Sequence, residues 1–291
     1  MSIQLFFDQL LNGFILGSMY ALFSSGLTLI WGTLKMLNFA HGEFYMLGGY
    51  SIYFALTLLG VPPVVGVFLA VGGVFLIGMV TERLIIHPLL GKPGWDVSPL
   101  VATLGVSIFL QNFALKVWGE RFKNVPYFIE GTLEVYGIRI AYQRLLILLV
   151  AVIIIGAFWL LLRRTRFGLA LRATSQDREA GSLMGINIHR VYLITFGVGS
   201  ALSALSATML APIFSINPWM GHAYLLKAFV VCVLGGLGSV EGAILAGVIL
   251  GMGESITVII FSSEWKDIVS FAILILVLVI RPSGFFGEKE L

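Results

Sequence analysis

The sequence predicts an all-α polytopic membrane protein with about eight transmembrane helices, some of them short or broken. The 291-residue chain is 58% hydrophobic and only 11% charged. Soluble proteins carry about 25% charged residues, and much of a soluble protein's surface must face water. A bilayer removes this constraint, and one span takes about 20 apolar residues. The length therefore has room for a single transmembrane domain, residues 1–291, and for no soluble domain.

Apolar runs divide the chain into candidate spans. No Lys or Arg precedes the first run, so it lacks the basic region of a cleavable signal peptide. Pro62 and Pro63 mark a tight turn after the second run, and glycines interrupt the seventh. The runs cover residues 10–30, 38–59, 64–86, 99–118, 145–162, 191–213, 223–240, 243–261 and 268–280.

The orientation of these spans follows from the basic residues of the short loops. The segment 163–190 holds six arginines and two acidic residues, so we expect it in the cytoplasm. Counting back places the N-terminus and the segment 119–143 on the periplasmic side. The C-terminus is cytoplasmic only if the run 223–240 crosses fully. Within 119–143, alternating apolar residues predict a small β-hairpin; they are Leu133, Val135, Ile138 and Ile140.

A polar motif, LNFAHGE at 37–43, stands at the start of the second run. Ionisable side chains within a span are costly and usually face a cavity or a partner. Asn38, His41 and Glu43 are therefore candidates for the lining or the gate of a transport route. The alternative is a polar helix start near the cytoplasmic surface, because His41 lies only about 9 Å from Lys35 along a helix.

Three glycines of the seventh run, Gly235, Gly236 and Gly238, are candidates for the same route. They can break a helix at membrane depth and expose carbonyl groups to a cavity. The alternative is close packing between helices, with the neighbouring Lys227 reaching the membrane surface through its long side chain. Two interrupted helices, at 38–50 and 234–247, lie in opposite halves of the chain, a pattern that often marks the binding region of a transporter.

The arginine-rich loop contains a second kind of motif. Residues 168–184 predict one or two short helices that carry apolar side chains beside charged ones, and Gly185 is suited to end them with a left-handed cap. Such an element can dock into a groove of a cytoplasmic partner. The alternative is a basic loop that fixes the topology and rests on anionic lipid. The apolar residues are Leu169, Leu171, Leu183 and Met184.

Several functions lack their motifs. There is no GxxxxGK[ST] phosphate loop, so we expect no ATP binding by that route. His87, His189 and His222 have no metal-ligand spacing, and Cys232 is the only cysteine, so we expect neither a metal site nor a disulfide. A net charge of +3 without a basic face argues against nucleic-acid binding. An intramembrane enzyme using His41 and Glu43 would need a third group, and the docking element argues against both that enzyme and a passive channel.

The motifs together resemble the LivH-type permeases of the branched-chain amino acid importer family. The resemblance covers nearly the whole chain, with the segment 119–143 departing most. It is carried by LNFAHGEFYMLG at 37–48, SIFLQN at 107–112, RATSQDREAGSLMGIN at 172–187, INP at 216–218, KAF at 227–229, VLGGLGS at 233–239 and KDIVSFAILILVLVIRP at 266–282.

The resemblance implies an ATP-driven importer of the bacterial inner membrane that moves branched-chain or related amino acids into the cytoplasm. This chain would pair with a LivM-like second permease, two LivG- and LivF-like ATPase subunits and a periplasmic substrate-binding protein, and it would be neither an enzyme nor a cofactor-binding protein. Urea, short amides and aromatic acids are the alternative substrates. The resemblance also implies that 172–187 is the segment that couples to an ATPase; the residues concerned are Arg172, Asp177, Arg178, Glu179, Ala180, Gly185 and Ile186.

Overall fold

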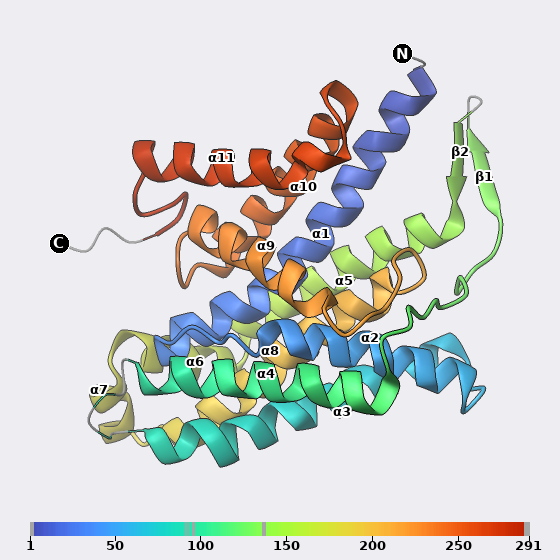
Figure 1. Ribbon diagram of the computed structural model, residues 1–291. Helices are drawn as coiled ribbons and strands as arrows, with labels where there is room; N and C mark the ends of the chain where they lie inside the picture. The colour runs from blue at the N-terminus through green and yellow to red at the C-terminus, as the bar shows by residue number, and fades with distance from the viewer. Residues whose placement is uncertain (1–2, 91, 93, 95–96, 136–137, 288–291) are drawn as a thin grey trace.

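A computed structural model describes residues 3–287 except 91, 93, 95, 96, 136 and 137. Within these residues the chain forms a helical bundle with one β-hairpin at its edge (Figure 1). The helices are α1 (Ile3–Leu34), α2 (His41–Thr57), α3 (Pro63–Thr81), α4 (Ser98–Trp118), α5 (Tyr142–Arg164), α6 (Arg166–Gln176), α7 (Arg178–Leu183), α8 (Ile188–Leu210), α9 (Met220–Gly235), α10 (Val240–Ile260) and α11 (Lys266–Ile280), and the strands are β1 (Thr132–Val135) and β2 (Ile138–Ala141).

The described helices include six that are long and apolar enough to cross a membrane and one shorter apolar helix, α9. The six lie at Phe6–Leu34, Pro63–Leu89, Ser98–Trp118, Tyr142–Arg164, Ile188–Leu210 and Val240–Ile260. The shorter helices α2, α9 and α11 have 17, 16 and 15 residues. At 1.5 Å per residue they measure about 22–26 Å, less than the hydrocarbon thickness of about 30 Å. The prediction of a polytopic all-α membrane protein with short helices is confirmed.

Helix α1 forms the centre of the bundle and packs antiparallel against α10. It begins at Ile3, earlier than the predicted start at residue 10. The contact runs along small residues one turn apart: Gly13 lies against Ser255, and Gly17 and Gly251 lie backbone to backbone. In lipid, the hydrophobic effect does not drive helices together, so their association depends on close packing. Small residues allow the two backbones to approach each other closely.

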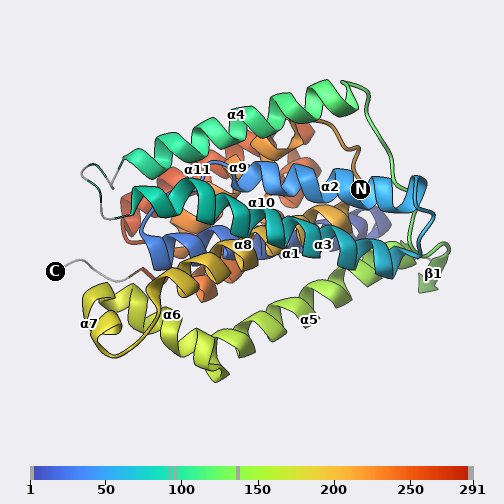
Figure 2. The ribbon, with the colours of Figure 1, turned by 90° about the horizontal axis from the view of Figure 1, so that it is seen from below.

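The outer helices expose apolar side chains to the lipid. Figure 2 shows α4 and α5 on opposite sides of the bundle, with α1 and α8 between them. In α4, large apolar residues such as Ile108 and Phe109 are exposed. The predicted hairpin is confirmed, because β1 and β2 pair antiparallel with Leu133 opposite Ile140; its turn lies outside the described residues. Beside it, Lys123 forms an isolated bridge with Ile216, which ties the loop before α9 to this edge.

The end of α9 reaches the level at which α1 ends. Gly238, just past α9, faces Gly32 near the inner end of α1. After α10 and α11, the chain returns to the same place, where the N–H groups of Phe285 and Phe286 donate to the carbonyl groups of Leu234 and Gly235. The helix α9 is too short to cross the membrane by itself, but the C-terminal segment lies beside the end of α1. This is the cytoplasmic side in the orientation predicted from the arginines.

Candidate translocation and coupling sites

The polar motif at 37–43 lies where the chain turns back after α1. Helix α1 ends at Leu34, Lys35 takes a positive φ of 55°, and α2 begins at His41. The predicted interruption at 38–50 is therefore too long, because α2 is a continuous helix from His41 through Tyr50. Only the segment 35–40 is non-helical.

His41 lies near mid-depth of the bundle. Its Nε2 atom donates to the carbonyl group of Phe23 at 2.9 Å, and Phe23 stands close to the middle of the span Phe6–Leu34. Ser203, near the middle of α8, donates to the carbonyl group of His41 at 3.0 Å. The two contacts argue against a helix start near the cytoplasmic surface. The distance of about 9 Å between Lys35 and His41 assumed that the chain is helical from Lys35 onward. Residues 35–40 are not helical, so that distance does not apply.

Asn38 and Glu43 are held by short polar contacts. Asn38 Oδ1 accepts from the N–H of Ala40 at 3.1 Å, and Glu43 Oε1 accepts from the Ser107 hydroxyl at 3.1 Å. Asn38 and His41 are fully buried and Glu43 is 2% exposed. Each also carries one buried polar atom without a hydrogen-bond partner among the described residues, namely Asn38 Nδ2, His41 Nδ1 and Glu43 Oε2. Buried unpaired polar atoms are costly, so each of these three atoms calls for a partner or a role.

Helix α4 contributes two residues to this site: Thr103, which no motif indicated, and Ser107, the first residue of the SIFLQN motif. Thr103 Oγ1 accepts from the N–H of Phe39 at 3.2 Å, and Ser107, one turn further along, donates to Glu43. The two hydroxyl groups on one face of α4 thus hold the segment between α1 and α2 and the first turn of α2.

Helix α9 begins beside the start of α2 and runs the other way. Gly42 and Gly221, in the first turns of the two helices, meet backbone to backbone, and Tyr45 stacks on Tyr224 with ring centroids 4.2 Å apart. In Figure 1, α2 extends from the middle of the bundle toward the side of the hairpin, and α9 toward the side of α7. Two half-helices therefore meet near mid-depth with their N-termini side by side.

A further interruption lies at 211–219, before α9. The break predicted within 234–247 is present at 236–239, where it is the turn between α9 and α10. Gly235 ends α9, and Gly236 with a φ of 96° turns the chain toward α10. The carbonyl groups there accept from the C-terminal segment and do not open into a cavity. The contacts of Gly235, Gly236 and Gly238 support the packing alternative for this motif. Lys227 does not reach the membrane surface either; it pairs with Glu254 inside the bundle.

The arginine-rich loop forms two short helices, as predicted. Asp177 ends α6 and caps α7, its Oδ1 accepting from the N–H groups of Glu179 and Ala180. Gly185, with a φ of 85°, ends α7. Its N–H donates to Ser182, and the N–H of Ile186 donates to Gly181. This pair of bonds is a Schellman motif. Arg172 Nη1 donates to the carbonyl group of Leu162, which fixes α6 to the end of α5.

The exposed side of α7 carries an apolar face. Leu183 and Met184 are 89% and 84% exposed, and Ala180 stands three and four residues before them, where helical side chains share a face. Arg178 and Glu179 are exposed beside this face. Of the predicted coupling residues, Arg172, Asp177, Gly185 and Ile186 shape the segment, and Ala180, Arg178 and Glu179 are available to a partner.

Short helices that meet inside an apolar bundle, together with a capped element that exposes an apolar face, are the features of a transport permease. The family described as branched-chain amino acid transport system / permease component matches residues 9–278, and the chain belongs to this family.

Three of its relatives match over nearly their whole length. The permease protein BraD of a high-affinity branched-chain amino acid transport system, from Pseudomonas aeruginosa, is 38% identical over 98% of this chain and 97% of its own. The corresponding LivH of Escherichia coli K12 is 36% identical over 98% and 96%. The probable LivH of Methanocaldococcus jannaschii is 26% identical over 96% and 92%. No solved structure matches the chain.

The chain is therefore a multi-pass inner-membrane permease subunit of an ATP-binding-cassette importer. It is a transport subunit and not an enzyme, with ATP hydrolysis on separate subunits. Its assembly includes ATPase and substrate-binding partners.

Proposed function

We propose that this permease imports branched-chain amino acids from the periplasm into the cytoplasm. The observation that carries the proposal is the 38% identity to BraD over 98% of the chain, because BraD is named for high-affinity branched-chain amino acid transport. Since the match is nearly end to end, it includes the membrane core and the cytoplasmic segment alike. Urea, short amides and aromatic acids remain the alternative substrates.

The assembly that fits this function has a LivM-like second permease, LivG- and LivF-like ATPase subunits and a periplasmic binding protein. The face of Ala180, Leu183 and Met184 supports an ATPase contact through α7, because exposed apolar side chains on a rigid cytoplasmic element are typical of a docking surface. The capped ends of α7 support it as well, since a rigid element transmits displacement better than a loop does.

The translocation route follows the meeting point of α2 and α9, with Asn38, His41 and Glu43 as its gate. Interrupted helices whose N-termini lie near the membrane midplane are a recurring feature of transporter binding regions. The unpaired atoms of these three residues support the assignment, because a passing polar substrate would satisfy them. The backbone contact of Gly42 and Gly221 would hold this gate closed in the present conformation.

The substrate is tested with the complete importer in vesicles. We expect uptake of labelled leucine that excess isoleucine or valine inhibits and that urea, acetamide or benzoate does not. Inhibition by one of the latter three without inhibition by isoleucine and valine would replace the proposed substrate by the corresponding alternative.

The gate assignment predicts that Glu43→Gln lowers leucine uptake at least fivefold while the subunits still copurify. Glutamine keeps the shape and can accept from Ser107, but it removes the carboxylate charge. His41→Gln should act similarly, because its amide can still donate to Phe23. The matched control is Glu120→Gln at an exposed position, which should transport like the wild type. Wild-type uptake by both gate variants would show that these residues serve only as a buried helix start.

A further inference from the structure

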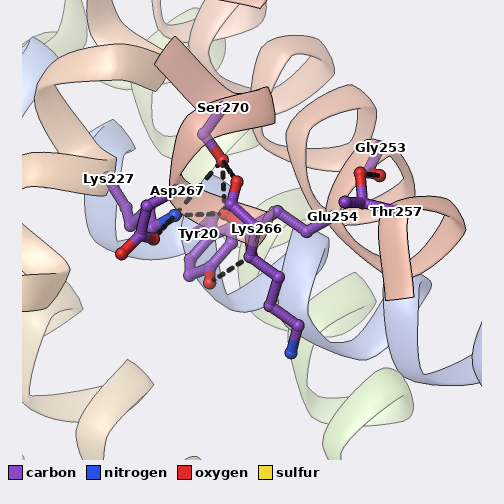
Figure 3. A network of polar contacts seen from close by, with 8 residues as sticks. All are labelled: Tyr20, Lys227, Gly253, Glu254, Thr257, Lys266, Asp267 and Ser270. Atoms are coloured by element: carbon purple, nitrogen blue, oxygen red, sulfur yellow. Dashed lines mark hydrogen bonds and ion pairs between the residues drawn. The ribbon is translucent and has the colours of Figure 1, made fainter. Parts of the chain in front are cut away.

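A second polar cluster lies deep in the bundle, centred on Lys227 (Figure 3). Lys227 Nζ is 2.6 Å from Glu254 Oε1 and 2.6 Å from Asp267 Oδ1, and it donates to the Ser270 hydroxyl at 3.2 Å. Tyr20 donates to the other oxygen of Glu254 at 2.9 Å. The cluster joins α1, α9, α10 and α11.

The cluster extends from inside the bundle to one end of α11. Tyr20, the midpoint of the span Phe6–Leu34, reaches Glu254 inside the bundle, whereas Asp267 stands in the first turn of α11. Charged groups at such depth face the interior, a water-filled route or a partner, because lipid does not solvate them. We therefore interpret the cluster as a functional group of residues and not as a surface ion pair.

The two carboxylates of the cluster differ in their surroundings. Glu254 is 2% exposed and is held on both oxygens, by Lys227 and Ser270 on one and by Tyr20 on the other. The side chain of Asp267 is 74% exposed, and that of Lys227 is 15% exposed. Lys227 thus has one buried partner, Glu254, and one partner, Asp267, whose side chain lies on the outer surface of this chain.

The Asp267 contact can be released without leaving Lys227 unpaired. Ion pairs with an exposed partner contribute little to stability, whereas a buried charge that loses its partner is costly. If Asp267 turns away, Glu254 still balances Lys227, and the ammonium group regains room for a second anion. The released Asp267 in turn regains room for a cation.

We propose that the Lys227–Asp267 pair opens to bind the main-chain charges of an amino-acid substrate. The substrate carboxylate replaces Asp267 on Lys227, and the substrate ammonium group pairs with Asp267. This inference rests on the proposed function, since an amino acid carries both charges on one carbon atom. Neutral urea or an amide lacks both, and an aromatic acid lacks the ammonium group.

The first test compares two carboxylates in the same importer. Asp267→Asn should lower leucine uptake at least tenfold, and Asp267→Glu should restore most of it, because only the charge is required. The control is Glu264→Gln, three residues earlier and exposed, which should transport like the wild type. Normal uptake by Asp267→Asn would reject this inference alone, whereas a wild-type importer that takes up no leucine would reject the proposed function.

The second test asks whether position 267 faces water in the assembled importer. An ion pair that only holds α9 and α11 together would not need to face water. Cysteines at Asp267 and at the neighbouring Ile268, which is 57% exposed, are compared after Cys232 is replaced by serine. A cationic, membrane-impermeant methanethiosulfonate should modify Asp267→Cys at least tenfold faster than Ile268→Cys. Equal, slow modification of both would show that the pair is shielded from water and would overturn the proposal.

Discussion

Replacing Gly251 with leucine should prevent the bundle from forming. A side chain at this position would meet the backbone of Gly17 and Gly13, and a backbone cannot move aside unless α1 and α10 separate. Overpacking typically costs about 1–3 kcal/mol, and occasionally more. We expect the upper end or beyond, because α1 is the central helix of the bundle. The variant should not accumulate as a monodisperse species in detergent, as measured by fluorescence-detected size exclusion.

The control for this effect is Gly73→Leu on α3. A Cβ atom there meets nothing within 4 Å, so the new side chain would extend from the outer surface of this chain. Its elution profile and thermal stability should match the wild type. Equal stability of Gly251→Leu and Gly73→Leu would contradict the packing of α1 against α10.

Replacing Ala180 with tryptophan should uncouple the permease from its ATPase. The small side chain lies on the face that also carries Leu183 and Met184, and a tryptophan would overfill a fitted groove. A cost of about 1–3 kcal/mol corresponds to roughly 5- to 150-fold weaker docking. We expect weak copurification of the ATPase subunits and loss of substrate-stimulated ATP hydrolysis, with unchanged membrane insertion because no span is altered.

The matched control is Ser182→Trp on the same helix. Ser182 is also exposed, but two residues along a helix turn the side chain by about 200°, so it points away from the face of Ala180. It should bind the ATPase subunits like the wild type. Full ATPase binding and full transport by Ala180→Trp would show that the segment 163–190 does not couple to the ATPase and only fixes the membrane topology.

The two short helices of the arginine-rich loop were predictable because their signals are local. An acidic residue one position before a short helix and a glycine two positions after it indicate caps from the sequence alone, and Asp177 and Gly185 have these roles in the structure. The hairpin was predictable for the same reason, since its alternation is a property of neighbouring residues.

The depth of the polar motif at 37–43 was not predictable in this way. The distance from Lys35 to His41 depends on whether the chain between them is helical, and the polar motif is compatible with either case. The partner interruption at 211–219 did have a signal, because Pro212 and Pro218 flank it and proline marks breaks in a helix. The glycines at 235–238 are a more conspicuous feature, but they form the turn between α9 and α10.

The partners of Lys227 could not be found from spacing either. Glu254 and Asp267 stand on two other helices, and only the packing of α9, α10 and α11 brings them together. From the sequence, an isolated lysine in an apolar run fits a side chain that reaches the surface equally well.

The central claim, that this chain is the membrane part of an ATP-driven importer, is tested most directly by uptake into vesicles. The assembled importer is reconstituted with ATP inside and the leucine-loaded binding protein outside. We expect labelled leucine to accumulate above its external concentration only when ATP and this chain are both present. Equilibration of leucine without ATP would indicate a passive channel, and undiminished accumulation by an assembly that lacks this chain would contradict the account.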